Sequence, residues 1–270
     1  MTEHSTLAFS QAFSDARELE FDGRWDEAAA LLHEVCATAA AESPRYEARA
    51  LVNLLRLRNF QDFIQHSDHG GEKAEVLARL EALGDDLADP RLLADALHER
   101  AVDLHFRYFV GEGNLMTERE MLEEALALRR SVGDEAGVGW SLVYIGTIDQ
   151  IEIDHGAGLP MFEEALAIAT QLVDPVLASY ATRHIGYVRQ YRKEWAAAEE
   201  AFAKSLAQRE KAGWLAGTAS ALQALGGMML AHREFERARV LLLRAREIGE
   251  EIAAGKILDS VERDLTRCSA

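Results

Sequence analysis

The sequence of 270 residues contains only two cysteines, Cys36 and Cys268, which lie near opposite ends of the chain. Two cysteines cannot build a disulfide framework, and the absence of a CxxC pair argues against a thiolate metal site or a redox motif. Cys36 falls on an apolar face of a predicted helix, where a cysteine is usually buried and unreactive. The cysteine content therefore points away from small secreted scaffolds and leads us to expect a cytoplasmic protein.

Long apolar runs are also missing. No segment approaches the roughly 18 consecutive apolar residues that mark a membrane-spanning helix. The first residues, 1–14, lack the basic and then apolar layout of a secretion signal. We therefore expect no membrane association.

Basic residues are scarce, because 29 lysines and arginines stand against 46 acidic residues and leave a formal net charge of −17. A nucleic-acid-binding protein needs a basic track along one surface, and this chain contains no such run of lysines and arginines. The pairs Arg129-Arg130 and Arg192-Lys193 are isolated. The charge balance therefore disfavours a nucleic-acid partner, whereas it could attract cationic ligands.

Only four prolines are present, hydrophobic residues make up 49% of the chain, and alanine, leucine and glutamate recur throughout. This composition favours helices in a globular protein. No GxSxG nucleophile motif, phosphate-binding glycine loop or dinucleotide fingerprint occurs. We therefore assign no catalytic residue, no cofactor and no metal ligand, and the sequence leaves open whether the protein is an enzyme while leaning against it.

What the chain does contain is a repeat of forty residues. Each member of one column is a glycine after an aliphatic residue: Gly146, Gly186 and Gly226. A second column holds small residues at the same spacing: Ala125, Ala165, Ser205 and Ala245. Three residues before each of these stands a large apolar residue: Leu122, Phe162, Phe202 and Leu242. Phased columns of this kind predict stacked helix-turn-helix units, in which small residues allow close helix contacts and large residues fill the space between units.

These residues resemble the tetratricopeptide repeat family, in a forty-residue variety that occurs in bacterial regulatory and signalling proteins. The resemblance is carried by residues 185–206 and 225–245, and Gly23-Arg24-Trp25-Asp26-Glu27-Ala28 near the start repeats the signature of the turn into a second helix. It implies an all-α fold, a right-handed α-solenoid of about six helix-turn-helix repeats followed by a C-terminal capping helix.

We expect one solenoid over residues 1–270, with a first repeat at 5–40, degenerate repeats at 44–131, regular repeats at 134–252 and a cap at 255–267. Asp-Pro and Ser-Pro pairs mark the starts of three first helices, since proline is tolerated in the first turn. The predicted helices are 5–21, 25–40, 44–65, 72–84, 90–108, 117–131, 135–153, 158–172, 175–191, 195–211, 215–231, 235–252 and 255–267. Residues 109–114 form an insertion between two helices.

In this family the first helix of each repeat lines a concave groove. The resemblance implies that side chains at fixed offsets from the small residue point into that groove and bind a ligand or partner. They are Arg56, Asn59, His98, Val102, His105, Trp140, Thr147, Gln150, Tyr180, Arg183, Tyr187, Gln190, Tyr191 and Gln223. We expect His98, His105, Arg183 and Tyr187 to be partly exposed, and we expect the second-helix residues Leu126, Phe202 and Leu242 to be buried.

Two polar clusters have alternative interpretations. His98, Glu99 and His105 share a helix, but histidines seven residues apart lie about 10 Å apart along the axis, too far for one ion to bridge easily. We interpret them as polar groove residues, with ligand binding as the alternative. The segment from His66 to Glu72 contains histidine and carboxylate side chains, yet a Gly-Gly turn after a helix end explains it without a metal.

The resemblance implies a binding module that recognises a peptide or protein segment in the concave groove and has a regulatory role. An alternative is a small-molecule-binding or catalytic protein whose solenoid interior is a pocket lined by aromatic, histidine and arginine side chains, with residues 109–114 as its lid. An oligomerisation scaffold is a third possibility. The shape of the binding surface discriminates between a peptide and a small ligand.

Overall fold

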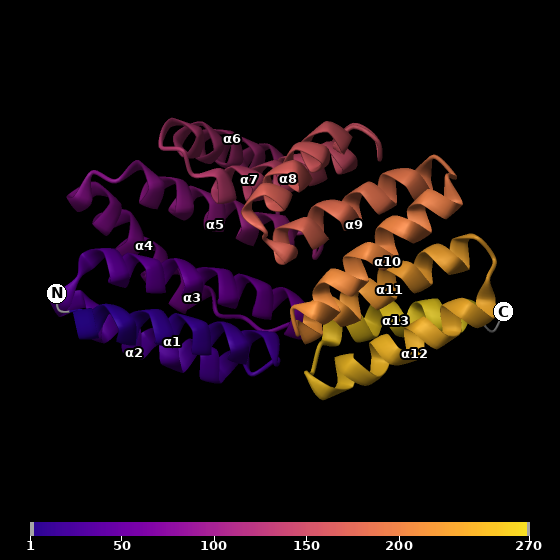
Figure 1. The fold of residues 1–270 in the computed structure, drawn as a ribbon, viewed down its shortest axis with the longest axis horizontal. Helices are drawn as coiled ribbons and strands as arrows, with labels where there is room; N and C mark the ends of the chain where they lie inside the picture. The colour runs from indigo at the N-terminus through magenta and orange to yellow at the C-terminus, as the bar shows by residue number, and fades with distance from the viewer. Residues whose placement is uncertain (1–2, 269–270) are drawn as a thin grey trace. The chain divides into compact units, whose positions relative to one another are not determined.

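The computed structural model describes residues 3–268 and the side chains of residues 6–268. In that part of the chain there are thirteen α-helices and no β-strand (Figure 1). The helices are α1 (Glu3–Phe21), α2 (Trp25–Glu42), α3 (Pro44–Gln65), α4 (Gly70–Leu87), α5 (Pro90–Tyr108), α6 (Leu115–Ser131), α7 (Glu135–Glu152), α8 (Leu159–Leu172), α9 (Pro175–Tyr191), α10 (Trp195–Lys211), α11 (Leu215–Ala231), α12 (Phe235–Glu251) and α13 (Gly255–Cys268). The fold is an all-α helical-repeat solenoid, as predicted.

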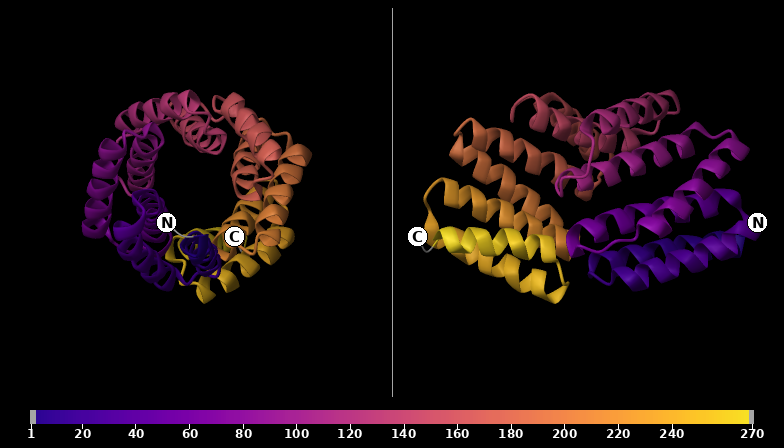
Figure 2. Two further views of the ribbon diagram at one scale, coloured as in Figure 1. Left: turned by 60° about the vertical axis from the view of Figure 1, so that its left-hand side comes forward. Right: turned by 180° about the vertical axis from the view of Figure 1, so that it is seen from behind.

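The chain divides into two compact units, Met1–Asp134 and Glu135–Ala270, which we call unit 1 and unit 2. In unit 1, α3 packs against α2, α4 and α5, and α5 forms a hairpin with α6. In unit 2, successive hairpins are formed by α7 and α8, α9 and α10, and α11 and α12, and α13 covers α11 and α12 (Figure 2). The boundary falls where the regular repeats were predicted to begin.

The glycine column lies at close helix crossings in unit 2. A Cβ atom placed on Gly146 would lie 2.7 Å from the ring of Phe162, and one on Gly186 would lie 3.0 Å from the ring of Phe202. Gly226 faces Leu242 in the same way, at 2.9 Å. The predicted close helix crossings at the glycine column are therefore confirmed, and the large residues, predicted to lie between units, also pack between the two helices of each hairpin.

The starts of the first helices also follow the sequence. α3, α5 and α9 each begin with a proline, whose missing N–H would have no helical partner in the first turn. Asp174 caps α9 because its Oδ1 accepts hydrogen bonds from the backbone N–H groups of Val176 and Leu177, at 2.9 and 3.0 Å. Asp89 caps α5 in the same manner through Arg91 N.

One turn recurs every forty residues, between a second helix and the following first helix. It has a left-handed backbone at the positions Gly133, Val173, Gly213 and Ala253, with φ of 68°, 55°, 70° and 51°. The next residue donates a backbone hydrogen bond back to the end of the helix, as in Asp134 N to Arg129 O at 3.0 Å and Trp214 N to Arg209 O at 3.1 Å. Asp134 and Trp214 therefore occupy equivalent places in two repeats, as do Arg129 and Arg209.

The predicted insertion at 109–114 is an exposed loop of unit 1. The Phe109 ring lies against the rings of His105 and Phe63, with centroids 5.3 and 6.1 Å away. Asn114 ends the loop and caps α6 by accepting from two backbone N–H groups. Across the described residues, no helix has both the length and the apolar character required to cross a bilayer.

Candidate functional site

The predicted binding residues of unit 1 are mostly buried. His98 and His105 are each only 5% exposed, and Asn59 and Val102 are buried with them, whereas Arg56 is exposed. The expectation that both histidines are partly exposed is therefore wrong. The physical reason is that α5 packs against α3, α4 and α6, so that little of its surface is left for a ligand.

These buried polar groups are held by partners within unit 1. His105 Nδ1 lies 2.8 Å from Oε1 of the fully buried Glu118 on α6. Asn59 Nδ2 donates to the backbone oxygen of Glu99 at 3.0 Å and to its Oε2 at 3.2 Å. Burial raises the pKa of the Glu99 carboxyl to about 7 and lowers the pKa of His98 well below its ordinary value. His98 is thus held in its neutral form at pH 7, whereas Glu99 is neutral only below about pH 7.

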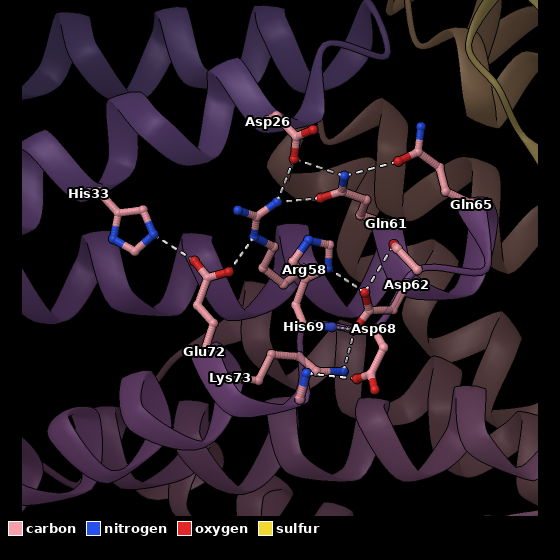
Figure 3. A network of polar contacts seen from close by, with 12 residues as sticks. Asp26, His33, Arg58, Gln61, Asp62, Gln65, Asp68, His69, Glu72 and Lys73 are labelled. Carbon is pink, nitrogen blue, oxygen red and sulfur yellow. Dashed lines mark hydrogen bonds and ion pairs between the residues drawn. The ribbon is translucent and has the colours of Figure 1, made fainter.

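A second group of polar side chains ties α2, α3 and α4 together (Figure 3). The guanidinium of Arg58 on α3 donates from Nη1 to Asp26 Oδ1 at 2.9 Å and to Gln61 Oε1 at 2.6 Å. Its Nε donates to Glu72 Oε2 on α4 at 2.9 Å, and the other oxygen of Glu72 lies 2.6 Å from Nε2 of His33. One buried arginine therefore joins three helices.

The same network continues toward α5. Lys73 Nζ lies 2.8 Å from Asp62 Oδ2 and 2.5 Å from Asp103 Oδ1, and Asp62 also accepts from the backbone N–H of His69. Burial opposes ionisation of Asp62, but the hydrogen bonds from Lys73 and His69 hold the pKa of its carboxyl below the ordinary value. The turn at 66–69 is thus fixed by protein contacts. In the described chain, no three His, Cys, Asp or Glu side chains gather as metal ligands would.

A shallow cavity of about 200 Å³ lies beside this network, at the turn between α1 and α2. It is lined by Gly23, Arg24, Trp25, Asp26, Glu27, Gln61 and Gln65. Arg24 is paired with Glu27 at 2.6 Å, and Asp26 is paired with Arg58. Since its charged groups already have partners, we assign this region to holding the hairpins together.

Unit 2 presents a different surface. One side of α9 carries five of the predicted binding residues at helical spacing: Tyr180, Arg183, Tyr187, Gln190 and Tyr191. The first four are half-buried, and Tyr191 is 55% exposed. The expected exposure of Arg183 and Tyr187 is therefore confirmed, and so is the burial of Leu126, Phe202 and Leu242.

The side chains on this face of α9 contact one another and neighbouring rings. Arg183 Nη2 donates to the Tyr187 hydroxyl at 3.0 Å, and the guanidinium lies 5.3 Å from the Tyr187 ring centroid. Tyr180 packs edge-to-face on Trp140 of α7 at 5.0 Å and stacks on Trp214 at 5.7 Å. The result is an arginine beside a row of aromatic rings that extends from α7 to the start of α11.

The remaining predicted residues of unit 2 are more enclosed. Thr147 and Gln150 are buried, and Gln150 Oε1 lies 2.9 Å from Nδ1 of His184. Gln223 donates to Asp264 of α13 at 2.8 Å, so the capping helix provides its partner. In unit 2, the accessible part of the predicted set is thus on α9 and at Trp140.

One functional candidate, Arg209 on α10, was missed because the family pattern assigns binding to first helices. Arg209 is 2% exposed, and its guanidinium lies beside the stacked rings of Tyr180 and Trp214, 5.0 and 5.1 Å from their centroids. Nε donates to Ser179 Oγ at 3.1 Å and Nη1 donates to Gly217 O at 3.0 Å, while Nη2 has no hydrogen-bond partner. A sequence signal existed, since Arg209 follows Arg129 by 80 residues, or two repeat lengths.

Solved structures resemble the whole chain. BtubC from P. vanneervenii superposes with a TM-score of 0.55 at 18% identity, over 89% of this chain and 91% of that one. A Rap protein complexed with competence and sporulation factor superposes with a TM-score of 0.55 at 13% identity, over 97% and 85%. No protein-family model and no curated protein sequence matches the chain. With its phased columns and stacked hairpins, the chain has the tetratricopeptide-type helical-repeat fold.

Proposed function

We propose that this protein is a binding module that recognises a peptide or protein segment along the first-helix face of unit 2, and that it acts as a regulator in the cytoplasm. The observation that carries the proposal is the row of half-buried and exposed side chains on α9, from Tyr180 to Tyr191. Large aromatic and arginine side chains with one accessible side are the residues that dominate binding energy at protein interfaces.

The chemistry of the row suits a chain segment. Tyrosine and tryptophan rings offer flat apolar contact with little loss of side-chain freedom, and the amide of Gln190 can pair with a peptide backbone. A similarly folded Rap protein was solved in complex with competence and sporulation factor, which supports a binding role for this architecture. The proposed regulatory role rests on the sequence resemblance.

The alternative of a small-molecule or catalytic pocket is less well supported. Two of its residues, His98 and His105, are buried within unit 1 and are thereby kept from a ligand. A pocket would retain only the aromatic and arginine side chains of unit 2. Native mass spectrometry of freshly purified protein separates the two functions, because a stoichiometric small molecule would favour the alternative.

The proposal is tested by a photo-crosslinking residue at Gln190, with the same residue at the exposed position Glu200 of α10 as the control. We expect cross-links to a defined segment of one partner from position 190 only. For that partner, Arg183→Ala and Tyr187→Ala should each weaken binding by about 1–3 kcal/mol, while Glu200→Ala leaves it unchanged. Cross-links from position 200 alone, with binding insensitive to both alanines, would move the site to the second helices.

A further inference from the structure

Two arginines at equivalent positions of the repeat have opposite electrostatic surroundings. Arg129 and Arg209 are both buried near the end of a second helix, 4% and 2% exposed, and each is followed by the same left-handed turn. Arg129 Nη2 lies 2.8 Å from Asp95 Oδ1, and its Nε lies 3.7 Å from Asp134 Oδ2. The arginine of unit 1 is thus compensated by two carboxylates.

Arg209 has no acidic partner at either place. The position equivalent to Asp134 holds Trp214, and the Nε of Arg209 donates to the neutral hydroxyl of Ser179. Within residues 3–268, Arg209 forms no ion pair, and its Nη2 has no hydrogen-bond partner. A buried charge without a counter-charge is costly, and proteins usually pair such a charge or remove it.

A second cation stands close by. Burial, and then the positive charge of Arg183, lower the pKa of the Arg209 guanidinium to about 9. Arg183 is also without an acidic partner among the described residues, and its buried Nε has no hydrogen-bond partner. Tyr180, which lies against Arg209, precedes Arg183 by one helical turn on the same face of α9. Two guanidinium groups without acidic partners therefore lie close enough to influence each other, Arg183 at the face proposed for binding and Arg209 buried beneath it, in a chain whose net charge is −17.

We propose that Arg183 and Arg209 form an oxyanion site, in which a carboxylate or phosphate group of the ligand supplies the negative charge that Asp95 and Asp134 supply in unit 1. Arg183 is half-buried and contacts the oxyanion directly. Arg209 is buried beneath Arg183 and stabilises the oxyanion through its positive electrostatic potential. The group attached to the oxyanion is flat and apolar, because the partly accessible ring of Tyr180, one helical turn from Arg183, packs against the partly accessible ring of Trp140. This inference rests on the proposed function, whose ligand chemistry it specifies.

The test uses small probes, so that it does not depend on knowing the partner. Benzoate, phenylphosphate and the uncharged benzamide are titrated by calorimetry into the full chain in low-salt buffer. We expect saturable binding of at least one anion and none of benzamide, and the preferred anion identifies the oxyanion as carboxylate or phosphate. Arg183→Gln should weaken this binding at least tenfold.

Two further variants make the result specific. Arg189→Gln is the matched control, since Arg189 lies on the same helix but already pairs with Glu194 at 2.6 Å, and it should bind the anion as the native chain does. Trp214→Asp restores the acid of the equivalent repeat and should abolish anion binding by pairing with Arg209. If that variant fails to fold, Arg183→Gln alone decides.

The oxyanion site is overturned if neither anion binds at about 10 mM, if benzamide binds as well as the anions, or if Arg183→Gln leaves anion binding unchanged. If any of these results is obtained while position 190 still cross-links to a partner, the proposed binding function remains supported and only the oxyanion site is rejected. Anion binding without cross-links would support the site and direct the search toward a small ligand.

Discussion

Unit 1 and unit 2 hold their first helices in place by different means. In unit 1, α3 and α5 turn polar side chains toward their neighbours, where Asn59 meets Glu99 and His105 meets Glu118. In unit 2, the hairpins close over Gly146 and Gly186, with phenylalanine rings against the glycine backbone. Polar side chains that are used for packing in unit 1 are therefore left at the accessible face of α9 in unit 2. The comparison teaches that helix hairpins of one repeat type can either bury the polar side chains of their first helices or leave them accessible.

The largest contrast between the units is expected at the two equivalent arginines. Arg129→Met leaves two carboxylates without their counter-charge and should destabilise the chain by about 3–5 kcal/mol, as removing one partner of a buried ion pair does. Arg209→Met removes an uncompensated charge together with two hydrogen bonds and two guanidinium–ring contacts, and should cost about 1–2 kcal/mol. Urea unfolding of both variants measures the difference. Equal losses would mean that Arg209 is compensated as Arg129 is.

The next largest effect is expected at the glycine crossings of unit 2. Gly186→Leu forces a side chain against Phe202 and should destabilise by about 1–3 kcal/mol or more, because the helices cannot separate without losing their packing. Gly71→Leu in unit 1 is the control, since nothing lies within 4 Å of a Cβ atom there. Thermal melts compare the two, and similar melting temperatures would argue against a close crossing at Gly186.

A smaller effect concerns pH and is confined to unit 1. The pKa of Glu99 is raised to about 7 in the folded chain, so its contribution to stability is complete below about 4.5 and is lost as the pH rises through 7. The pKa of His98 is lowered by burial. The contribution of His98 to the free energy of unfolding is therefore complete above about pH 6.5 and is lost as the pH falls below that value. The two effects offset each other between pH 5 and about 7 in the native chain.

Single substitutions separate these contributions. Glu99→Gln should leave a chain whose free energy of unfolding falls toward acid pH, by about 2 kcal/mol between pH 7 and 5 at most. His98→Gln should show the reverse slope. Urea unfolding at pH 5, 6, 7 and 8 measures both slopes, and parallel profiles for the two variants would show that these groups are not titrating as their burial requires.

The helices were predictable from the sequence because their signals are local. Pro90 and Pro175 mark helix starts, and the spacing of Gly146, Gly186 and Gly226 places the hairpins. The accessible side chains of α9 were predicted from their fixed offsets to Gly186 in the same repeat pattern. In unit 1, however, α5 contacts three other helices, α3, α4 and α6. These contacts depend on the tertiary structure, and the repeat pattern of the family does not reveal them.

Arg209 and Trp214 were not predicted for a related reason. The family pattern names side chains of first helices, whereas Arg209 lies on a second helix and Trp214 precedes the next first helix. Their proximity to Tyr180 depends on how three helices meet, and no single helix encodes it. A comparison of each repeat with its equivalents along the chain would have singled out Trp214 in the place of Asp134.

The repeated left-handed turn at residues 133 and 213 has an evolutionary consequence. Because the backbone is the same in both repeats, replacement of the acid after the turn by an aromatic residue changes the chemistry without rebuilding the hairpin. In a solenoid, each repeat depends mainly on its immediate neighbours. Selection could therefore create a recognition site in one repeat while the other repeats retained their stability, and duplication of a hairpin could supply the raw material for such divergence.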